Sequence, residues 1–487
     1  MKLIFEKSTL NRKGLKLPKL DVEECKLPSE NLLEAEKINL PQIGELELVR
    51  HYTNLSKLNY CLDSHFYPLG SCTMKYNPKI LETVASLEGF TQLTPNLSLS
   101  KDGFKYSQGS LALLFQLQNL LAEITGTSQV TLQPLAGAQG ELTGMLIARA
   151  YHQQKNNQRK YVIVPDTSHG TNPASVAMAG YQAISVPTGS NGQMDLAIFK
   201  EKLNDQVAAV IMTCPNTLGI FNTQIKEICD LAHEHDALTY YDGANLNAIL
   251  AKIKPAELGF DIVHLNLHKT FSTPHGGGGP GAGPVGVVEK LVSFLPEPYV
   301  VKDENNNFSL VENSPDSIGK VAPFFGNFQV LVKALTYILI LGKEGLEKVS
   351  EIAVLNANYI LESLKDNYKI PFSRKCMHEC VISAEAQKEN GVSALDIAKY
   401  LIQEGIHPPT IYFPLIVKEA MMIEPTETES KKTLDQFIQI MKKAAKLAKE
   451  SPQTLQQAPT NFIFSRFDEV KAARAQNLKY EGKNKRR

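Results

Sequence analysis

The stretch that decides the fold of this chain is Asp261-Ile-Val-His-Leu-Asn-Leu-His-Lys269, which runs on to a glycine-rich segment at residues 276–286. Apolar and polar residues alternate along it with the period of two that is typical of a β-strand. Lys269 therefore comes at the end of a predicted strand. The alternation predicts one face made of Val263, Leu265 and Leu267 and an opposite face made of His264, Asn266 and His268.

Lys269 is a candidate for the covalent attachment of a carbonyl compound. A lysine amine forms a Schiff base when its site is desolvated or when a nearby cation favours the neutral amine. The alternative is an ordinary charged residue that ends a strand. The glycine-rich segment holds seven of the chain's 31 glycines, so it excludes a helix and lets backbone approach a ligand closely.

Helices and strands alternate from about residue 107. This order is typical of an α/β fold with a mostly parallel sheet covered by helices, and ligands on such sheets bind at the carboxyl ends of the strands. The predicted strands are 130–132, 161–164, 183–186, 208–212, 238–241 and 262–267, all but the first expected to be buried, and the predicted helices are 110–124, 141–152, 195–203 and 223–234.

Three regions are predicted along the chain. Residues 1–90 are polar with few clear periods and are interpreted as an N-terminal arm, or as an ordinary surface segment. Residues 91–325 form the large domain. Residues 326–487 form a smaller α+β domain with helices at 328–342, 345–366 and, as the last one, 430–449, and with short strands near 380–384 and 411–413.

Composition excludes several classes of protein. Lys and Arg number 51, as do Asp and Glu, so net charge gives no argument for binding nucleic acid or an anionic membrane. The seven cysteines are dispersed without a C-x-x-C pair, which favours reduced thiols and a cytoplasmic location. The first residues lack the apolar stretch of a signal peptide, and no apolar run approaches the length of a transmembrane helix.

A phosphate-binding helix start is predicted at Leu135-Ala-Gly-Ala-Gln-Gly-Glu141, between a strand and a helix. Small residues that open a helix expose backbone N–H groups, and the helix dipole favours an anion there. Gly137, Ala138 and Gln139 would offer those N–H groups. The alternative is a simple Gly-Ala turn.

Two further loops after predicted strands carry polar residues. In Asp166-Thr-Ser-His169-Gly-Thr-Asn-Pro173, His169 is placed to stack on a flat ring or to act as an acid or base; the alternative is a helix cap. In Tyr240-Tyr-Asp242-Gly-Ala244, the carboxylate of Asp242 can keep a pyridine nitrogen protonated, and the small Ala244 lets a ring lie flat; the alternative is an N-cap aspartate.

Other motifs are judged to be coincidental. Gly281-Ala-Gly-Pro-Val-Gly286 matches the dinucleotide pattern G-x-G-x-x-G, but a Val-rich strand follows it instead of a helix. His275-Gly-Gly-Gly278 resembles a lipase oxyanion loop, but the chain has no G-x-S-x-G elbow. His264 and His268 lie on a strand and lack the glutamate of an H-E-x-x-H site, so no metal site is predicted.

The loops together predict pyridoxal 5'-phosphate (PLP) as the cofactor. They supply an aldimine lysine (Lys269), a carboxylate for the pyridinium (Asp242), a stacking histidine (His169) and a helix start for the phosphate. The chain order, with a small domain after the lysine, is that of the aspartate-aminotransferase-like, fold type I PLP enzymes.

Several segments resemble the glycine cleavage system P-protein, glycine dehydrogenase (decarboxylating). The similarity runs from about residue 50 to 430. The chain resembles the carboxyl half of single-chain P-proteins, and therefore resembles subunit 2 of the two-subunit form. The segments are Phe66-Tyr-Pro-Leu-Gly-Ser-Cys-Thr-Met-Lys75, His169-Gly-Thr-Asn-Pro-Ala-Ser175, Leu265-Asn-Leu-His-Lys-Thr270, Cys376-Met-His-Glu379, His407-Pro-Pro-Thr-Ile-Tyr-Phe-Pro414 and Met421-Met-Ile-Glu-Pro-Thr-Glu-Thr-Glu429.

The resemblance implies a PLP-dependent decarboxylation of glycine that releases CO2 and transfers the aminomethyl group to the lipoyl arm of H-protein. It implies a partner, subunit 1, in an α2β2 heterotetramer, with Lys269 and His169 as catalytic residues. Asn216 and His268 would be additional cofactor contacts. Two alternatives stay open, namely another PLP enzyme and a non-catalytic assembly subunit. No arginine is placed to anchor the glycine carboxylate, and the H-protein docking surface is not visible in the sequence.

Overall fold

The structure is a computed structural model that describes residues 2–16, 18–23, 40–276, 281–312, 314–323, 325–372, 375–462 and 466–478. Residues 277–280 of the glycine-rich segment lie outside the described residues, as do Cys25 and the last residues, Lys483-Asn-Lys-Arg-Arg487. The chain divides into two compact units, Met1–Ser64 and His65–Arg487, which are taken one at a time. The predicted boundaries at residues 90 and 325 stay predictions.

The first unit contains the 3-10 helix η1 (Ile4–Lys7) and the helix α1 (Glu45–Ser56). The helix was not predicted from the sequence. His51 is the one buried residue of α1, and Leu46, Val49 and Leu55 are exposed. The described part of this unit therefore buries little apolar surface of its own.

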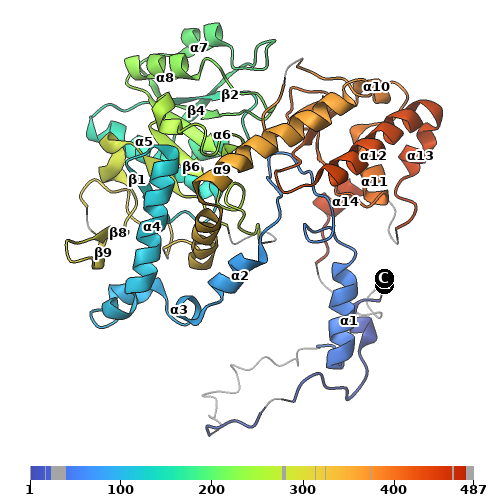
Figure 1. Ribbon diagram of the computed structural model, residues 1–487, viewed down its shortest axis with the longest axis horizontal. Helices are drawn as coiled ribbons and strands as arrows, with labels where there is room; N and C mark the ends of the chain where they lie inside the picture. Colours follow the sequence, from blue (N-terminus) through green and yellow to red (C-terminus); the bar gives the residue numbers. More distant parts are fainter. Residues whose placement is uncertain are drawn as a thin grey trace. The chain divides into compact units, whose positions relative to one another are not determined.

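A seven-stranded sheet organises the second unit, in the order β1-β7-β6-β5-β4-β2-β3 (Figure 1). The strands from β2 to β6 run parallel, while β7 is antiparallel to both β1 and β6. The prediction of a mostly parallel α/β sheet is confirmed. The strands are β1 (Gln129–Thr131), β2 (Tyr161–Pro165), β3 (Gln182–Val186), β4 (Val207–Thr213), β5 (Leu238–Gly243), β6 (Ile262–Leu265) and β7 (Val285–Val287).

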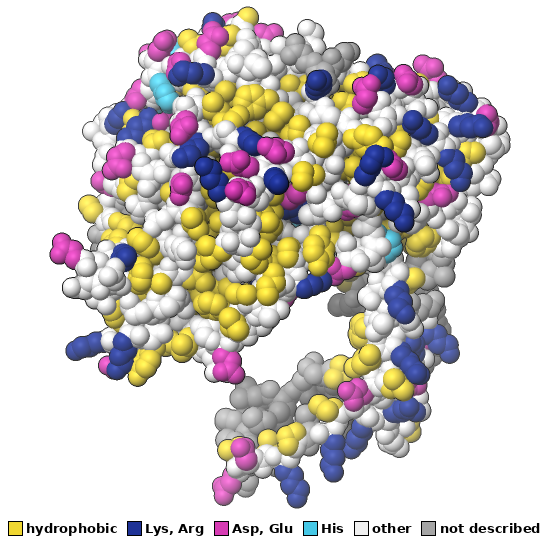
Figure 2. All heavy atoms as spheres, in the orientation of Figure 1, with side chains coloured by type: hydrophobic (Ala, Val, Ile, Leu, Met, Phe, Trp, Pro, Cys, Tyr) yellow, Lys and Arg dark blue, Asp and Glu magenta, His cyan; other side chains and the backbone are white. Residues whose placement is uncertain are grey.

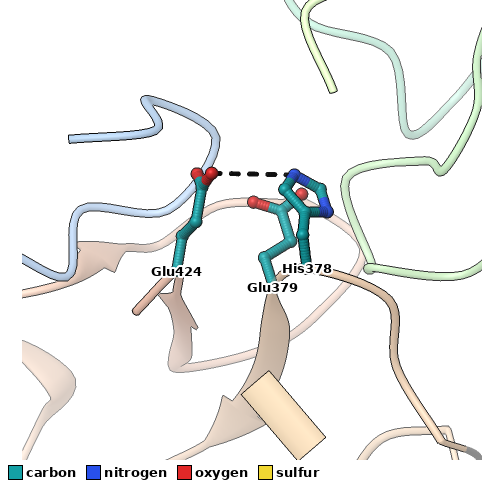
Figure 3. Close-up of side chains that lie close together, drawn as sticks. All are labelled: His378, Glu379 and Glu424. Carbon is teal, nitrogen blue, oxygen red and sulfur yellow. Dashed lines mark ion pairs between the residues drawn. The ribbon is translucent and has the colours of Figure 1, made fainter. Parts of the chain in front are cut away.

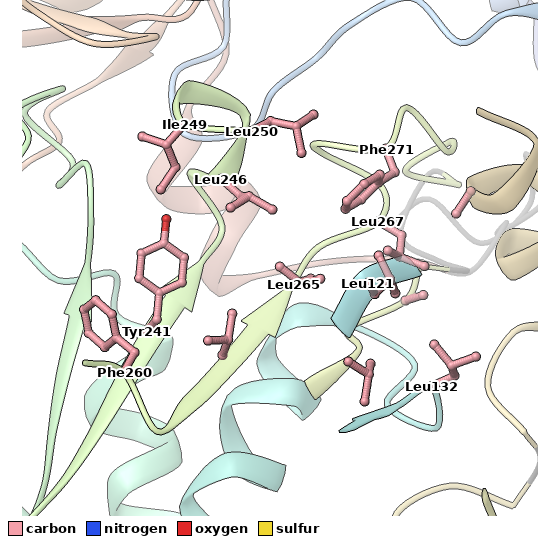
Figure 4. Close-up of a cluster of buried hydrophobic side chains, with 14 of the residues drawn as sticks. Leu121, Leu132, Tyr241, Leu246, Ile249, Leu250, Phe260, Leu265, Leu267 and Phe271 are labelled. Atoms are coloured by element: carbon pink, nitrogen blue, oxygen red, sulfur yellow. The ribbon is translucent and has the colours of Figure 1, made fainter. Parts of the chain in front are cut away.

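Helices cover both faces of this sheet. Strand β4 is buried along its whole length because its alternate residues enter two cores: Val210 and Met212 pack in one, and Ala209 and Ile211 in the other. Figure 4 draws part of the first core, with Leu265 and Phe271 near Leu121. The covering helices are α4 (Gln108–Thr125), α5 (Gly137–Gln154), α6 (Thr171–Met178), α7 (Leu196–Lys202) and α8 (Ile225–Glu234).

The carboxyl-terminal part builds a second, antiparallel sheet in the order β10-β12-β11. Its helix α9 (Phe328–Leu364) is broken at Gly342, where φ is 60° and ψ is −174°, and this break explains the two helices predicted there. The other elements are β10 (Cys380–Ser383), β11 (Thr410–Ile411), β12 (Ala420–Ile423), α10 (Glu385–Lys388), α11 (Ala394–Gln403), α12 (Lys431–Glu450), α13 (Pro452–Gln457) and α14 (Glu469–Arg474).

Three expectations need correction. Strand β3 lies at the edge of the sheet and its first residues are exposed, so it is not a buried strand. Strand β6 ends at Leu265, four residues before Lys269, because the N–H of Lys269 turns back to the carbonyl oxygen of Asn266 at 3.0 Å. The helix α12 is followed by α13 and α14, so it is not the last one.

The remaining elements are short. The hairpin β8 (Tyr299–Lys302) and β9 (Phe308–Val311) was not predicted from the sequence. None of the described helices combines the length and apolarity that crossing a bilayer requires. The other short elements are α2 (Lys79–Ala85), α3 (Glu88–Thr91), η3 (Pro95–Leu99), η4 (Phe104–Tyr106), η5 (Leu246–Ala248), η6 (Pro255–Leu258) and η7 (Glu289–Phe294).

Hydrophobic side chains gather on one face of the second unit (Figure 2), in the region where Figure 1 draws α2, α3 and α9. The exposed apolar residues of these helices include Ile80, Leu339 and Ile340, which are 47%, 56% and 56% exposed. An apolar face of this kind is typical of a contact with another protein.

Candidate active site

A cavity of about 270 Å³ opens at the carboxyl ends of β4, β5 and β6. Parallel strands bring their carboxyl ends to one edge of the sheet, so loops that are distant in sequence meet there. Seven of the predicted site residues line the cavity, namely Lys269, Asp242, His169, Ala244, Gly137, Ala138 and His268. Seven of the nine candidates therefore converge on one place.

Lys269 reaches into the cavity from the turn after β6. Its Nζ donates to the backbone carbonyl oxygen of Ser71 at 2.7 Å. Val263, Leu265 and Leu267 are all buried in the first core, and Asn266 and His268 line the cavity. The two faces predicted from the alternation are confirmed even though the strand itself is shorter.

Asp242 is held as a carboxylate at the end of β5. Asn172 Nδ2 and Thr213 Oγ1 donate to its Oδ2 at 3.1 and 3.2 Å, and the N–H of Ala244 donates to its Oδ1 at 3.0 Å. Burial pushes the pKa of Asp242 up, but the nearby His264 and these hydrogen bonds outweigh burial and leave it below its usual value.

His264 lies beside that carboxylate on the neighbouring strand. Its Nε2 lies 3.4 Å from Asp242 Oδ1, and its Nδ1 is 2.8 Å from the hydroxyl of Tyr240. The ring is fully buried, and burial lowers its pKa. His264, which the sequence considered only as part of a metal decoy and as a strand-face residue, thus packs beside the cavity's carboxylate and is held by Tyr240.

Glu141 is a cavity residue to which the sequence assigned no role. Its carboxylate accepts hydrogen bonds from Thr171 Oγ1 at 2.7 Å and from Asn172 Nδ2 at 2.8 Å. Burial, together with the charge of Asp242, raises the pKa of Glu141 to about 7. The same Asn172 amide bridges both carboxyls, so the cavity has one ionised carboxylate and one group that can hold a proton near neutral pH.

The helix α5 begins at the cavity without a side-chain cap. Its hydrogen-bond ladder starts where Gly140 N–H donates to Ala136 O at 3.0 Å, so the N–H groups of the preceding first turn have no partner within the helix. A Cβ on Gly137 would lie 2.4 Å from Asn266 Oδ1, which explains a glycine there. An anion fits this helix start.

His169 and Ala244 lie at the cavity from two different loops. His169 is exposed at the rim, and its Nδ1 is 3.0 Å from Thr171 Oγ1. Burial of part of the ring and the charge of Lys269 lower its pKa. His268 also lines the cavity, and burial lowers its pKa to about 3, so it is a neutral ring there.

Two predicted contacts are not among the lining residues. The side chain of Asn216 donates to Gly192 O at 2.7 Å and accepts from the N–H groups of Leu218 and Ile220, so it orders its own turn. The side chain of Gln139 accepts from Leu135 N–H and donates to Val321 O. Only the backbone of Gln139 could serve an anion at the helix start.

The segment 65–77 packs against the turn that carries Lys269. Lys75 is buried; its Nζ donates to Thr270 O at 2.7 Å and pairs with Glu427 at 2.7 Å. A Cβ on Gly70 would lie 2.2 Å from Met422, so glycine is needed where this segment crosses β12. The sequence singled out this segment only by its resemblance, and it missed that Ser71 lines the cavity.

Comparison with known proteins identifies the family. A family model described as "Glycine cleavage system P-protein" matches residues 16–313, and a second one, "Glycine dehydrogenase, C-terminal domain", matches residues 349–464. The first alone covers more than half of the chain.

The chain belongs to the glycine cleavage system P-protein family.

Relatives in this family match at nearly full length. The chain is 54% identical over 477 residues to a probable glycine dehydrogenase (decarboxylating) subunit 2 from Caldanaerobacter subterraneus subsp. tengcongensis, with 97% of each chain covered. It is 51% identical to a protein of the same name from Listeria monocytogenes, covering 99% of this chain and 98% of the relative. The resemblance to P-proteins drawn from the motifs is confirmed.

Solved structures agree on the fold of this P-protein family member. A crystal structure of glycine decarboxylase (P-protein) in inhibitor-bound form aligns with a TM-score of 0.69 at 21% identity, over 86% of this chain and 93% of the other. A cysteine desulfurase from Thermococcus onnurineus aligns with a TM-score of 0.60 at 14% identity, over 78% and 95%. The prediction of the fold type I architecture is confirmed.

Proposed function

We propose that this chain is subunit 2 of a glycine dehydrogenase (decarboxylating). It catalyses the PLP-dependent decarboxylation of glycine and passes the aminomethyl group to the lipoyl arm of H-protein. The observation that carries the proposal is the meeting of Lys269, Asp242 and the open start of α5 in one cavity, in a chain that belongs to the P-protein family.

The residues present fit PLP. The uncapped start of α5 suits its phosphate, and the carboxylate of Asp242 suits its ring nitrogen. Ala244 is small enough to lie under a flat ring, and His169 lies at the rim. Lys269 is the attachment point. When bound, PLP supplies an electron sink for the electron pair that CO2 leaves behind.

Asp242 keeps its charge at the bottom of the cavity. Because its pKa lies below the usual value in spite of burial, it can hold a proton on the facing ring nitrogen at neutral pH. Hydrogen bonds from Asn172, Thr213 and the N–H of Ala244 prevent the carboxylate from rotating. Loss of this charge would weaken the decarboxylation step much more than it would weaken binding.

Proton transfer falls to Lys269 and Glu141. The amine of Lys269 is free to accept a proton once glycine has taken its place, and the Ser71 carbonyl lies within 2.7 Å to receive its N–H. Glu141, with a pKa of about 7, can exchange a proton within the same cavity. Lys269 is the one lysine or arginine among the described residues that line the cavity.

The partners follow from the family and from the surface. Curated relatives bear the name subunit 2, so a subunit 1 completes the enzyme. We infer an α2β2 assembly in the cytoplasm, with lipoylated H-protein as the acceptor. The apolar face around Ile80, Leu339 and Ile340 is suited to contact a partner subunit.

The test is co-expression with a candidate subunit 1, followed by measurement of labelled CO2 released from carboxyl-labelled glycine. Release should require glycine, PLP and lipoylated H-protein together. Release that does not depend on H-protein would indicate a different PLP enzyme. Full activity of the isolated chain would contradict the two-subunit assembly.

A further inference from the structure

Two buried glutamates stand opposite each other close to Lys269 without any role so far. Glu379 comes directly before β10, and Glu424 directly after β12. These strands are antiparallel, with Cys380 paired to Ile423, so the two glutamates are the next cross-strand neighbours. Both side chains are fully buried, and Figure 3 shows them on the same side of the strand pair, with His378 beside them.

Both carboxyls accept hydrogen bonds from the Ser71–Thr73 segment, whose Ser71 carbonyl in turn accepts from Lys269. Glu379 accepts from the N–H of Ser71 at 2.7 Å and from its hydroxyl at 3.2 Å. Glu424 accepts from the N–H of Thr73 at 2.9 Å and from its hydroxyl at 2.5 Å. The carbonyl of Ser71, between these two anchors, is the acceptor for Lys269 Nζ.

We propose that Glu379 and Glu424 are positioning residues: as a pair that shares one proton, they hold the Ser71–Thr73 backbone so that the Ser71 carbonyl receives the amine of Lys269 whenever that amine is free. The role of this pair during catalysis rests on the proposed function. It gives the displaced lysine a fixed place beside the substrate, from which it can return.

The close approach of two buried carboxyls supports the shared proton. Oxygen atoms of the two carboxyls lie within 4.8 Å of each other at full burial, where two adjacent negative charges are costly. Burial, and then the neighbouring Glu424, raises the pKa of Glu379 well above its usual value; burial also raises the pKa of Glu424. The positive charge of Lys269 opposes both shifts, which favours a pair with a single proton over one with two.

The other groups around the pair do not take that proton. His378 has its Nε2 3.8 Å from Glu424, but burial lowers its pKa to about 3. Burial raises the pKa of Cys72, so it faces the pair as a neutral thiol. Glu427 is paired with Lys75.

A divalent cation is the other occupant that this cluster could take. His378, Glu379 and Glu424 each offer a ligand atom within 4.8 Å of the others. The carboxylate oxygens, however, already accept hydrogen bonds from Ser71, Thr73 and Asn245. The observations therefore favour a proton over a cation between the two glutamates. The metal content of the purified protein is measured as part of the test.

The experiment uses the full chain co-expressed with subunit 1, with Glu379→Gln, Glu424→Gln and the double variant. Asp396→Asn is the matched control, because Asp396 is also a buried carboxylate of the carboxyl-terminal part, but its role is to cap the helix α11. Two rates are measured: kcat with glycine and H-protein, and the attachment of PLP to cofactor-free protein, followed by its visible absorbance. The second rate needs neither glycine nor H-protein.

Each single variant should lose less than about fivefold in both rates, because an amide N–H can replace the acid O–H that faces the remaining carboxylate. The double variant should lose more than about fiftyfold, beyond the product of the singles, with the glycine KM little changed. Asp396→Asn should lower thermal stability and leave both rates within about twofold.

A single variant as impaired as the double would overturn the shared proton. A double variant that attaches PLP at the normal rate would overturn the positioning role. Stoichiometric divalent metal in the wild-type protein, lost in either single variant, would replace the proton with a cation site. Wild-type protein that attaches PLP but releases no CO2 from glycine contradicts the proposed function alone and leaves the attachment test intact.

Discussion

Asp242 and the Glu379–Glu424 pair are all fully buried carboxyl groups near Lys269, yet their charge states differ. Asp242 accepts hydrogen bonds from Asn172, Thr213 and the N–H of Ala244, and its pKa stays low. The two glutamates also accept hydrogen bonds, but they face each other, and their pKa values rise. Burial alone does not decide whether a carboxyl group is ionised, because its nearest charged neighbour does.

The comparison gives the two sides of the cavity different tasks. In the proposed function, the sheet side supplies the charge of Asp242 for the cofactor. The side formed by segment 65–77 keeps backbone in place for the amine. Both sides meet at Lys269, whose removal should therefore have the largest effect.

Lys269→Ala should abolish PLP attachment and lower the rate of CO2 release by more than about a thousandfold, since no other amine lines the cavity in the described part of the chain. Visible absorbance and labelled CO2 release measure the two effects. Lys200→Ala, at an exposed lysine paired with Glu227, is the control and should behave as wild type. A Lys269→Ala protein that still turns over glycine would remove the lysine from its role.

Asp242→Asn should keep PLP attached but lower kcat at least about a hundredfold, because the ring nitrogen loses its charged partner. Asp261→Asn is the matched control, since Asp261 is also buried but lies at the opposite end of the sheet, where it accepts from the N–H of Thr239. That variant should lose stability without a comparable loss of kcat. Near-normal kcat in Asp242→Asn would show that the sheet side needs no charge.

Gly70→Ala should test the side formed by segment 65–77 without touching a charged group. The new methyl would lie 2.2 Å from Met422, so the segment must shift, at a cost of about 1–3 kcal/mol in unfolding free energy and with slower PLP attachment. Gly109→Ala, on α4 with open space around it, is the control and should be neutral or stabilising. Unfolding in denaturant compares the two.

Glu141→Gln should change how stability depends on pH. Because the folded-state pKa is raised to about 7, Glu141 favours the folded state fully below its unfolded pKa, and that stability is lost as the pH rises towards 7. The wild-type Tm should therefore fall more steeply than that of the variant between about pH 4.5 and 7. Over this pH range the wild-type protein should lose about 1–3 kcal/mol more unfolding free energy than the variant. Parallel Tm curves would mean that Glu141 is ionised throughout.

Much of the sheet side could be predicted from sequence. The period of two placed Lys269 just past a strand, and the order of strands and helices placed Asp242, Ala244, His169 and the start of α5 at one edge. These predictions succeed because periodicity and strand-end chemistry are local properties. Thr213, the last residue of β4, could have been found by the same rule.

Other residues gave a misleading local signal or none. Asn216 follows a strand as a ligand residue would, but its side chain satisfies the amides of its own turn. Glu141 follows the predicted phosphate-binding turn, and only the burial of its side chain beside Asp242 in the folded chain reveals its raised pKa.

The sequence by itself determined the family, the parallel sheet and the lysine, because these follow from motifs and from the period of side chains along a strand. Only the tertiary structure decided what surrounds the lysine on its other side. Ser71 meets Glu379 across 308 residues, and Thr73 meets Glu424 across 351. Contacts at such separation depend on how two sheets and the connecting segment pack, and so the charge of buried groups is fixed only in the folded chain.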